Sequence, residues 1–168
     1  MNYSNMIKYD TGNWSGINST IFFSGCNFHC PGCFNKEAQS FKYGHTFDKN
    51  AYNKFLSYAK DDTVDGICIL GGEPFHQNID ELYAFIKNIK KDTNKPIHIW
   101  TGYSVAELIF LEDKRILEIL KLCDTIVDGR FVEESKDLTL MFRGSSNQNV
   151  YKISTNENGV MIFDKMDV

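Results

Sequence analysis

The 168-residue sequence has no apolar run long enough to cross a bilayer and no excess of basic residues. A membrane-spanning helix needs about 20 mainly apolar residues in succession, and no stretch approaches that length. The net charge of -4 and the scattered Lys and Arg residues argue against a nucleic-acid-binding surface. The first sixteen residues are polar and lack the apolar segment of a signal peptide. We therefore expect a cytoplasmic protein that binds neither a membrane nor a nucleic acid.

The sequence also lacks internal repeats, low-complexity tracts and any obvious linker. Its hydrophobic content of 42% is ordinary for a globular protein, and its length suffices to bury a core. We expect one domain that spans residues 1–168. The five cysteines do not suggest a disulfide framework, because their number is odd and the cytoplasm keeps thiols reduced.

Short β-rich runs alternate with segments of helical periodicity. The predicted strands are Ser19–Ser24, Gly66–Leu70, Ile97–Thr101, Thr125–Asp128, and a hairpin of Val150–Ser154 with Val160–Phe163. The predicted helices are Phe47–Asp61 with Asp48 as cap, one carrying Ile79, Leu82, Tyr83, Ile86 and Ile89 on one face, one begun by a Ser104/Glu107 capping box, and Ile116–Leu122.

This alternation of strands and helices favours an α/β fold with a largely parallel sheet. A closed barrel of eight β/α units typically takes about 250 residues, which is more than this chain contains. A partial, open β/α barrel of four to five units fits the length better.

Three cysteines follow the predicted strand Ser19–Ser24 within eight residues. Cys26, Cys30 and Cys33 have C-x-x-x-C-x-x-C spacing, and ligands of parallel α/β folds collect at the carboxyl ends of strands. An iron–sulfur cluster uses thiolate ligands, normally four. Three thiolates would leave one iron open to a small molecule, in the same way that catalytic zinc keeps one position for substrate.

The alternative at this position is a structural zinc site in a non-catalytic interaction module. It would need a fourth ligand from His29, Cys68 or Cys123. We interpret Cys68 and Cys123 as buried core residues and His29 as a positional or surface residue. Because a second C-x-x-C is absent, the cluster is the favoured prediction.

Several motifs together resemble one family. The cysteine spacing resembles the signature of the radical S-adenosylmethionine (SAM) superfamily, and Gly71–Pro74 resembles its GGEP motif. The segments Gly25–Asn35, Val127–Phe131 and Arg143–Gln148 resemble the small activating components of anaerobic ribonucleoside-triphosphate reductases, which are glycyl-radical enzyme activases. In the glycine-rich lead-in, Asn18 stands where the family usually has arginine.

The resemblance implies a radical SAM-type partial barrel and a [4Fe–4S] cluster held by Cys26, Cys30 and Cys33, the catalytic cysteines, with the fourth iron open to SAM. It implies that the reduced cluster cleaves SAM to methionine and a 5′-deoxyadenosyl radical. The implied target is a glycine in the large subunit of anaerobic ribonucleoside-triphosphate reductase. An electron donor such as flavodoxin or a thiol system is a second implied partner.

The resemblance also implies SAM contacts at Gly71, Gly72 and Glu73. The two glycines lack a Cβ, so a ligand can approach their backbone closely. The Glu73 carboxylate and backbone are candidates to accept hydrogen bonds from the methionyl ammonium group, because charge-assisted bonds are strong.

Further SAM contacts are implied at five positions. Gly32, Phe34 and Asn35 lie next to Cys33 in the sequence and are candidate adenine or ribose contacts. For Phe34 the alternative is a core residue. Thr101 and Asp128 end predicted strands on the same rim, and each could instead cap a turn.

Two questions remain open at this level. The segment Arg143–Gln148 could contact the reductase, contact SAM or form a plain surface loop. Another radical SAM enzyme, such as an activase of pyruvate formate-lyase or a small-molecule tailoring enzyme, is the alternative function.

Overall fold

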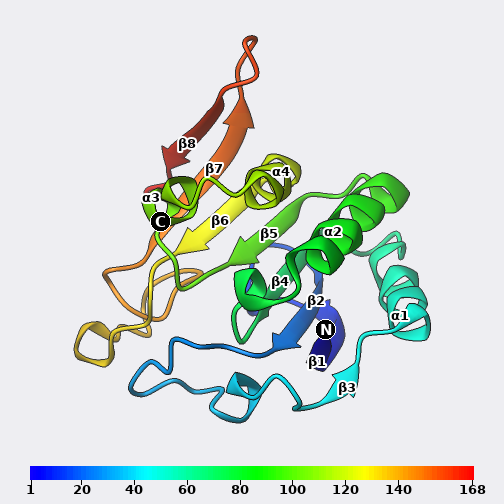
Figure 1. Ribbon diagram of the computed structural model, residues 1–168, viewed down its shortest axis with the longest axis horizontal. Coiled ribbons are helices and arrows are strands. Elements are labelled where there is room, and N and C mark those ends of the chain that lie inside the picture. The colour runs from blue at the N-terminus through cyan, green and yellow to red at the C-terminus, as the bar shows by residue number, and fades with distance from the viewer.

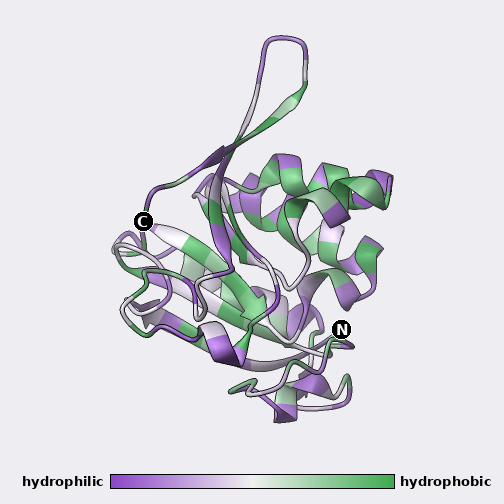
Figure 2. Cartoon of the chain, turned by 90° about the vertical axis from the view of Figure 1, so that its left-hand side faces the viewer, coloured by the Kyte–Doolittle hydropathy of each residue, from purple (hydrophilic) through white to green (hydrophobic).

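The computed structural model describes all residues, 1–168, and contains one eight-stranded sheet with helices gathered on one side (Figures 1 and 2). The strands are β1 (Asn2–Asp10), β2 (Asn18–Ser24), β3 (His45–Thr46), β4 (Gly66–Gly71), β5 (Ile97–Trp100), β6 (Thr125–Asp128), β7 (Asn149–Thr155) and β8 (Met161–Lys165). The helices are α1 (Lys49–Ala59), α2 (Ile79–Thr93), α3 (Val105–Phe110) and α4 (Lys114–Leu122). None of them is both long and apolar enough to span a lipid bilayer.

The sheet is mixed, with strand order β3-β1-β2-β4-β5-β6-β7-β8. The four central strands β2, β4, β5 and β6 are parallel, whereas the flanking strands pair antiparallel. The expected largely parallel sheet is therefore correct only for its centre. The predicted hairpin is confirmed as β7–β8, which projects from the body of the molecule (Figure 1). The sheet is open, with β3 and β8 at its edges, and the partial barrel stays a prediction.

The central strands have one face in the core and the other toward a cavity. Successive side chains of a strand point to opposite faces, so Phe23 of β2 and Ile69 of β4 pack in the hydrophobic core, beneath the helices. Their neighbours Phe22 and Leu70, paired in register, line a cavity together with Trp100 of β5. The strands β2, β4 and β5 thus each supply a residue to the wall of the candidate site.

Two helices begin at the caps that the sequence predicts, whereas α4 begins at Lys114, two residues before the predicted start. The Asp48 carboxylate accepts a hydrogen bond from the Ala51 N–H and caps α1. Ser104 and Glu107 form the complete capping box of α3. Such caps satisfy N–H groups that have no partner within the helix, which is why their sequence pattern is informative.

The sequence reading missed β1, which lies beside β2. Most residues of β1 are half-buried with no regular alternation, so the period of two that marks a strand is absent. Pairing with the buried strand β2 holds β1 in place. The interpretation of Cys68 and Cys123 as core residues is confirmed, since both are buried.

Candidate functional site

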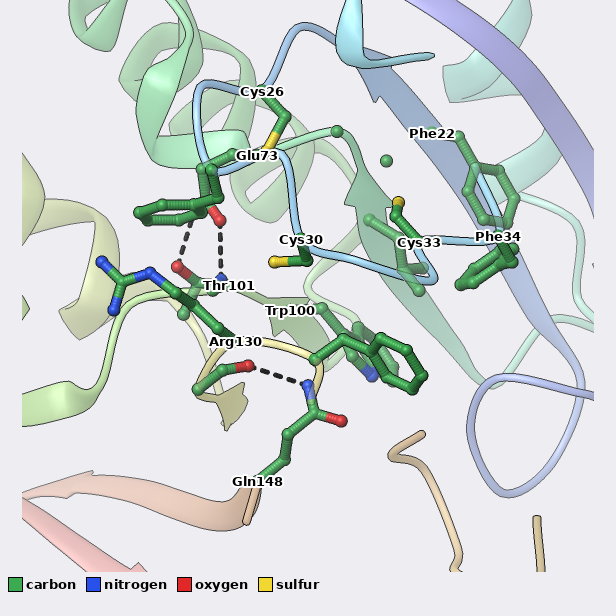
Figure 3. Close-up of a pocket in the computed structure, with 17 residues that line it drawn as sticks. Phe22, Cys26, Cys30, Cys33, Phe34, Glu73, Trp100, Thr101, Arg130 and Gln148 are labelled. Carbon is green, nitrogen blue, oxygen red and sulfur yellow. Dashed lines mark hydrogen bonds between the residues drawn. The ribbon is translucent and has the colours of Figure 1, made fainter. Parts of the chain in front are cut away.

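The carboxyl ends of the four parallel strands surround one cavity of about 160 Å³ (Figure 3). The cysteine loop follows β2, the Gly71–Glu73 turn ends β4, Thr101 follows β5, and Arg130 lies beyond β6. These segments are far apart in the sequence, and the parallel arrangement brings their ends to one edge of the sheet. The structure therefore joins the predicted cluster motif and the GGEP turn in one site.

Cys26, Cys30 and Cys33 all line this cavity as free, partly buried thiols. The loop is held in place because the Cys26 N–H donates to the Gln39 carbonyl (3.0 Å) and the Cys33 N–H donates to the Cys30 carbonyl (3.1 Å). His29 is exposed, and its Nδ1 lies 3.0 Å from Gln39 Oε1. This placement agrees with the positional or surface role expected of His29.

The thiols fit the ligand set of an iron–sulfur cluster. Figure 3 shows the three thiols spaced around the wall of the cavity. No three His, Cys, Asp or Glu side chains are placed to hold a single metal ion. Burial raises the pKa of Cys26 and Cys30, and the Arg130 guanidinium opposes the rise at Cys30. A cluster binds thiolates and so stabilises the deprotonated form.

The two glycines of the GGEP turn allow close contact between backbone segments of the protein itself. Gly71 has φ +137°, and a Cβ there would overlap the Phe23 carbonyl oxygen. A Cβ on Gly72 would likewise overlap the carbonyl oxygen of Gly25. The Gly72 N–H donates a hydrogen bond to the Phe23 carbonyl (2.7 Å), and the Glu73 N–H donates one to the Gly25 carbonyl (2.8 Å). The structure thus gives these glycines a role that differs from the expected approach of a ligand: they allow the end of β4 to contact the cysteine loop.

Glu73 is buried, with 1% of its surface exposed, and its carboxylate faces protein donors. Oε1 accepts from the Thr101 hydroxyl (2.8 Å) and the Phe75 N–H (3.0 Å), while Oε2 accepts from the Gly102 N–H (2.7 Å). Burial raises the pKa of Glu73 to about 7, although these bonds favour the charged form. The carboxylate therefore connects the ends of β4 and β5 beside the cavity.

Thr101 and Asp128 take different positions. Thr101 lines the cavity, and its hydroxyl donates a hydrogen bond to Glu73 Oε1. Asp128 does not line it: its Oδ2 accepts from the Val105 N–H (2.8 Å) at the start of α3, and its Oδ1 accepts from Asn149. Asp128 thus holds α3 and β7 behind the rim, in accord with the capping alternative.

Phe34, Gly32 and Asn35 lie on the outer side of the site. Phe34 is 91% exposed, which rules out the core alternative. It borders both the cavity lined by the three cysteines, which we call the cluster cavity, and a second cavity of about 490 Å³. Gly32 lines the second cavity, whereas Asn35 lines neither. The two cavities adjoin each other, because they share the lining residues Cys33, Phe34, Leu70, Trp100, Phe131 and Gln148.

Comparison with known proteins gives one consistent family. The model of the family described as "4Fe-4S single cluster domain" matches residues 13–151. The anaerobic ribonucleoside-triphosphate reductase-activating protein of Pasteurella multocida is 36% identical over 92% of this chain and 99% of its own length. Its namesakes from Haemophilus influenzae and Escherichia coli K12 are 35% and 34% identical, over 90% and 91% of this chain and 98% and 99% of theirs.

The chain belongs to the family of anaerobic ribonucleoside-triphosphate reductase-activating proteins. The resemblance seen in the cysteine, VDGRF and RGSSNQ segments is thereby confirmed. The family match also supports a 4Fe-4S cluster in this chain.

Asn18, at the position where the resemblance led us to expect arginine, has a local structural role. Its Nδ2 donates to the carbonyls of Trp14 (3.3 Å), Ser15 (3.1 Å) and Gly16 (3.4 Å). Trp14 in turn stacks on Phe142, with ring centroids 4.0 Å apart. The amide therefore closes the turn before β2 in this member of the family.

The sequence reading assigned no role to Arg130, which lines the cluster cavity. Its guanidinium lies 4.3 Å from the ring centroid of Phe28 and 3.3 Å from Glu107 Oε1. The available signal was its place directly after a predicted strand end, in the segment Val127–Phe131 whose resemblance to the activating proteins is noted above. The aromatic lining by Phe28 and Trp100 had no comparable signal, because aromatic residues near strands usually belong to the core.

Proposed function

We propose that this chain is a radical SAM activase that generates a glycyl radical on the large subunit of anaerobic ribonucleoside-triphosphate reductase. The observation that carries the proposal is that three thiols and the Gly71–Glu73 turn line one cavity, in a chain of the activating-protein family. The proposal includes the radical SAM type of partial barrel and a cytoplasmic location, where thiols stay reduced.

Cys26, Cys30 and Cys33 would each bind one iron of a [4Fe–4S] cluster, and SAM would occupy the fourth. When bound and reduced, the cluster supplies one electron that breaks the S–C5′ bond of SAM, giving methionine and a 5′-deoxyadenosyl radical, which takes a hydrogen atom from the target glycine. A flavodoxin or a thiol system would supply the electron. The protein contributes position, charge and exclusion of water.

The residues of the cavity suit these tasks. Phe22, Leu70 and Trp100 form an apolar floor that keeps water from the cluster. The Arg130 cation favours the thiolate form of Cys30. Glu73 lines the cavity, and its carboxylate fixes the ends of β4 and β5 beside the predicted position of the methionyl ammonium group.

The substrate glycine would belong to a polypeptide loop of the reductase that reaches the cluster through the second cavity. That cavity is the larger one, and it adjoins the cluster cavity at Cys33 and Phe34. Its wall is largely apolar and includes Phe34, Leu138 and Leu140, which suits a backbone segment with a small side chain.

The test is anaerobic reconstitution with iron and sulfide, followed by reduction, addition of SAM and quantification of 5′-deoxyadenosine. The reductase large subunit is then added, and the glycyl radical is measured by electron paramagnetic resonance (EPR). We expect both products from the wild type and neither from Cys30→Ala. Formation of 5′-deoxyadenosine without a glycyl radical would identify a different radical SAM enzyme. A wild-type protein that binds zinc and no iron would refute the proposal.

A further inference from the structure

The segment Arg143–Gln148, which we call the strap, is closed on itself by its own hydrogen bonds. Gln148 Oε1 accepts from the backbone N–H groups of Gly144 (2.9 Å) and Ser145 (3.1 Å). The Arg143 guanidinium donates from one NH group to the Gln148 carbonyl (2.7 Å) and from the other to the Val168 carbonyl (2.6 Å). A loop that is fixed in this way can hold another segment in place.

Three side chains of the strap bind the backbone of the segment Gly129–Val132. Gln148 Nε2 donates to the Gly129 carbonyl (2.8 Å), as Figure 3 shows. Asn147 Nδ2 donates to the Arg130 carbonyl (2.8 Å). The buried Ser145 hydroxyl accepts from the Val132 N–H (3.2 Å). These are bonds to main-chain groups, so they constrain where the segment runs and do not depend on its side chains.

The segment Gly129–Val132 is a wall of the cluster cavity. Gly129, Arg130 and Phe131 all line it. The Cys30 thiol lines the same cavity, to which this segment also brings the Arg130 cation. Positive charge and N–H donors near an iron–sulfur cluster stabilise its reduced form and raise its reduction potential.

We propose that the strap positions the wall Gly129–Val132 against the cluster ligand Cys30, with Asn147 and Gln148 as positioning residues that set the reduction potential of the cluster. The effect on the potential rests on the proposed function, because it requires the cluster. The bracing itself does not. This internal role differs from the three that the sequence left open, which were contact with the reductase, contact with SAM and a plain surface loop. It follows because the side chains of Ser145, Asn147 and Gln148 are engaged within the chain.

The test compares Asn147→Ala and Gln148→Met with Ser146→Ala. Asn147 is exposed and outside both cavities, so its replacement acts on the cluster only through the wall. Ser146 is its exposed neighbour and joins the fold through its backbone N–H bond to Ser135, which makes it the matched control. Hydrogen–deuterium exchange of residues 129–132 is measured in the metal-free proteins. The reduction potential is then measured in the reconstituted proteins by EPR-monitored titration.

We expect faster exchange at residues 129–132 and a more negative potential in Asn147→Ala and Gln148→Met, and wild-type values for both in Ser146→Ala. Wild-type exchange in Asn147→Ala would overturn the bracing. Faster exchange with an unchanged potential would overturn the positioning role. Failure of the proposed function appears separately, as a wild-type protein that takes up no cluster while the exchange difference between the variants persists.

Discussion

The buried pair of Thr101 and Glu73 leads to a pH-dependent prediction for the metal-free protein. Thr101→Val keeps the volume of the side chain but removes the hydroxyl that donates to Glu73 Oε1 and accepts from the Tyr103 N–H. The folded-state pKa of Glu73 is about 7, against an ordinary value of 4.5. The folded protein therefore binds more protons than the unfolded chain between these values, and its stability falls as pH rises through that window.

The size of the effect follows from the charge of the acceptor. A hydrogen bond to a charged group contributes about 1.5–3 kcal/mol, and one to a neutral group about 0.5–1.5 kcal/mol. Loss of the Thr101 donor raises the pKa of Glu73 further, because the charged form loses more than the neutral form. A rise of about one unit corresponds to roughly 1.4 kcal/mol at full ionisation. We therefore expect the loss of stability in Thr101→Val to be about 1 kcal/mol larger at pH 8 than at pH 5.5.

The assay is urea unfolding of the reduced, metal-free proteins at both pH values. Thr139→Val is the matched control, because the exposed Thr139 hydroxyl donates to Asp137 at the surface. We expect little change in the control and the same change at both pH values. An equal loss at pH 5.5 and pH 8 in Thr101→Val would show that the hydroxyl does not stabilise a buried carboxylate.

Three further outcomes follow from the site. Gly71→Ala should lower the free energy of unfolding by about 3 kcal/mol or more, because the new Cβ meets the backbone in a conformation reserved for glycine. The control Gly159→Ala, which has open space around the new Cβ, should lower it by about 1 kcal/mol. Equal losses of the two variants in urea unfolding would contradict the backbone argument. Arg130→Met should slow alkylation of Cys30 in the metal-free protein at fixed pH, since the pKa of Cys30 rises without the cation. Mass spectrometry of the modified peptide measures the alkylation rate. An unchanged rate would be evidence against an electrostatic effect of Arg130 on Cys30. Phe34→Ala should leave the free energy of unfolding within about 0.5 kcal/mol of wild type while raising the KM for SAM, and an unchanged KM would place Phe34 outside the SAM site.

The features predictable from the sequence are those determined by nearby residues. The Asp48 cap and the Ser104/Glu107 capping box act over three residues, so their pattern is visible in the sequence and the structure confirms both. The strand β4 is likewise a continuous buried run bounded by glycines. The cysteine spacing belongs to the same class, because one loop carries all three thiols.

The features that the sequence could not reveal depend on contacts between distant segments. The Glu73 carboxylate was expected to face a ligand, yet its hydrogen bonds come from Thr101, Gly102 and Phe75. Asp128 ends a strand as predicted but faces α3 and β7, away from the cavity lining. The direction of a strand-end side chain depends on the neighbouring strand, and a single sequence does not record that pairing.

The alternation of the central strands has a consequence for how the protein tolerates change during evolution. Phe22 and Phe23 are adjacent, yet one lines the cavity and the other packs in the core. Substitution can therefore alter the cavity without altering the core. Insertion or deletion of one residue within β2 or β4 would exchange the two faces and damage both at once. Length changes should consequently be confined to surface segments such as the β7–β8 turn, and the central strands should diverge by replacement alone.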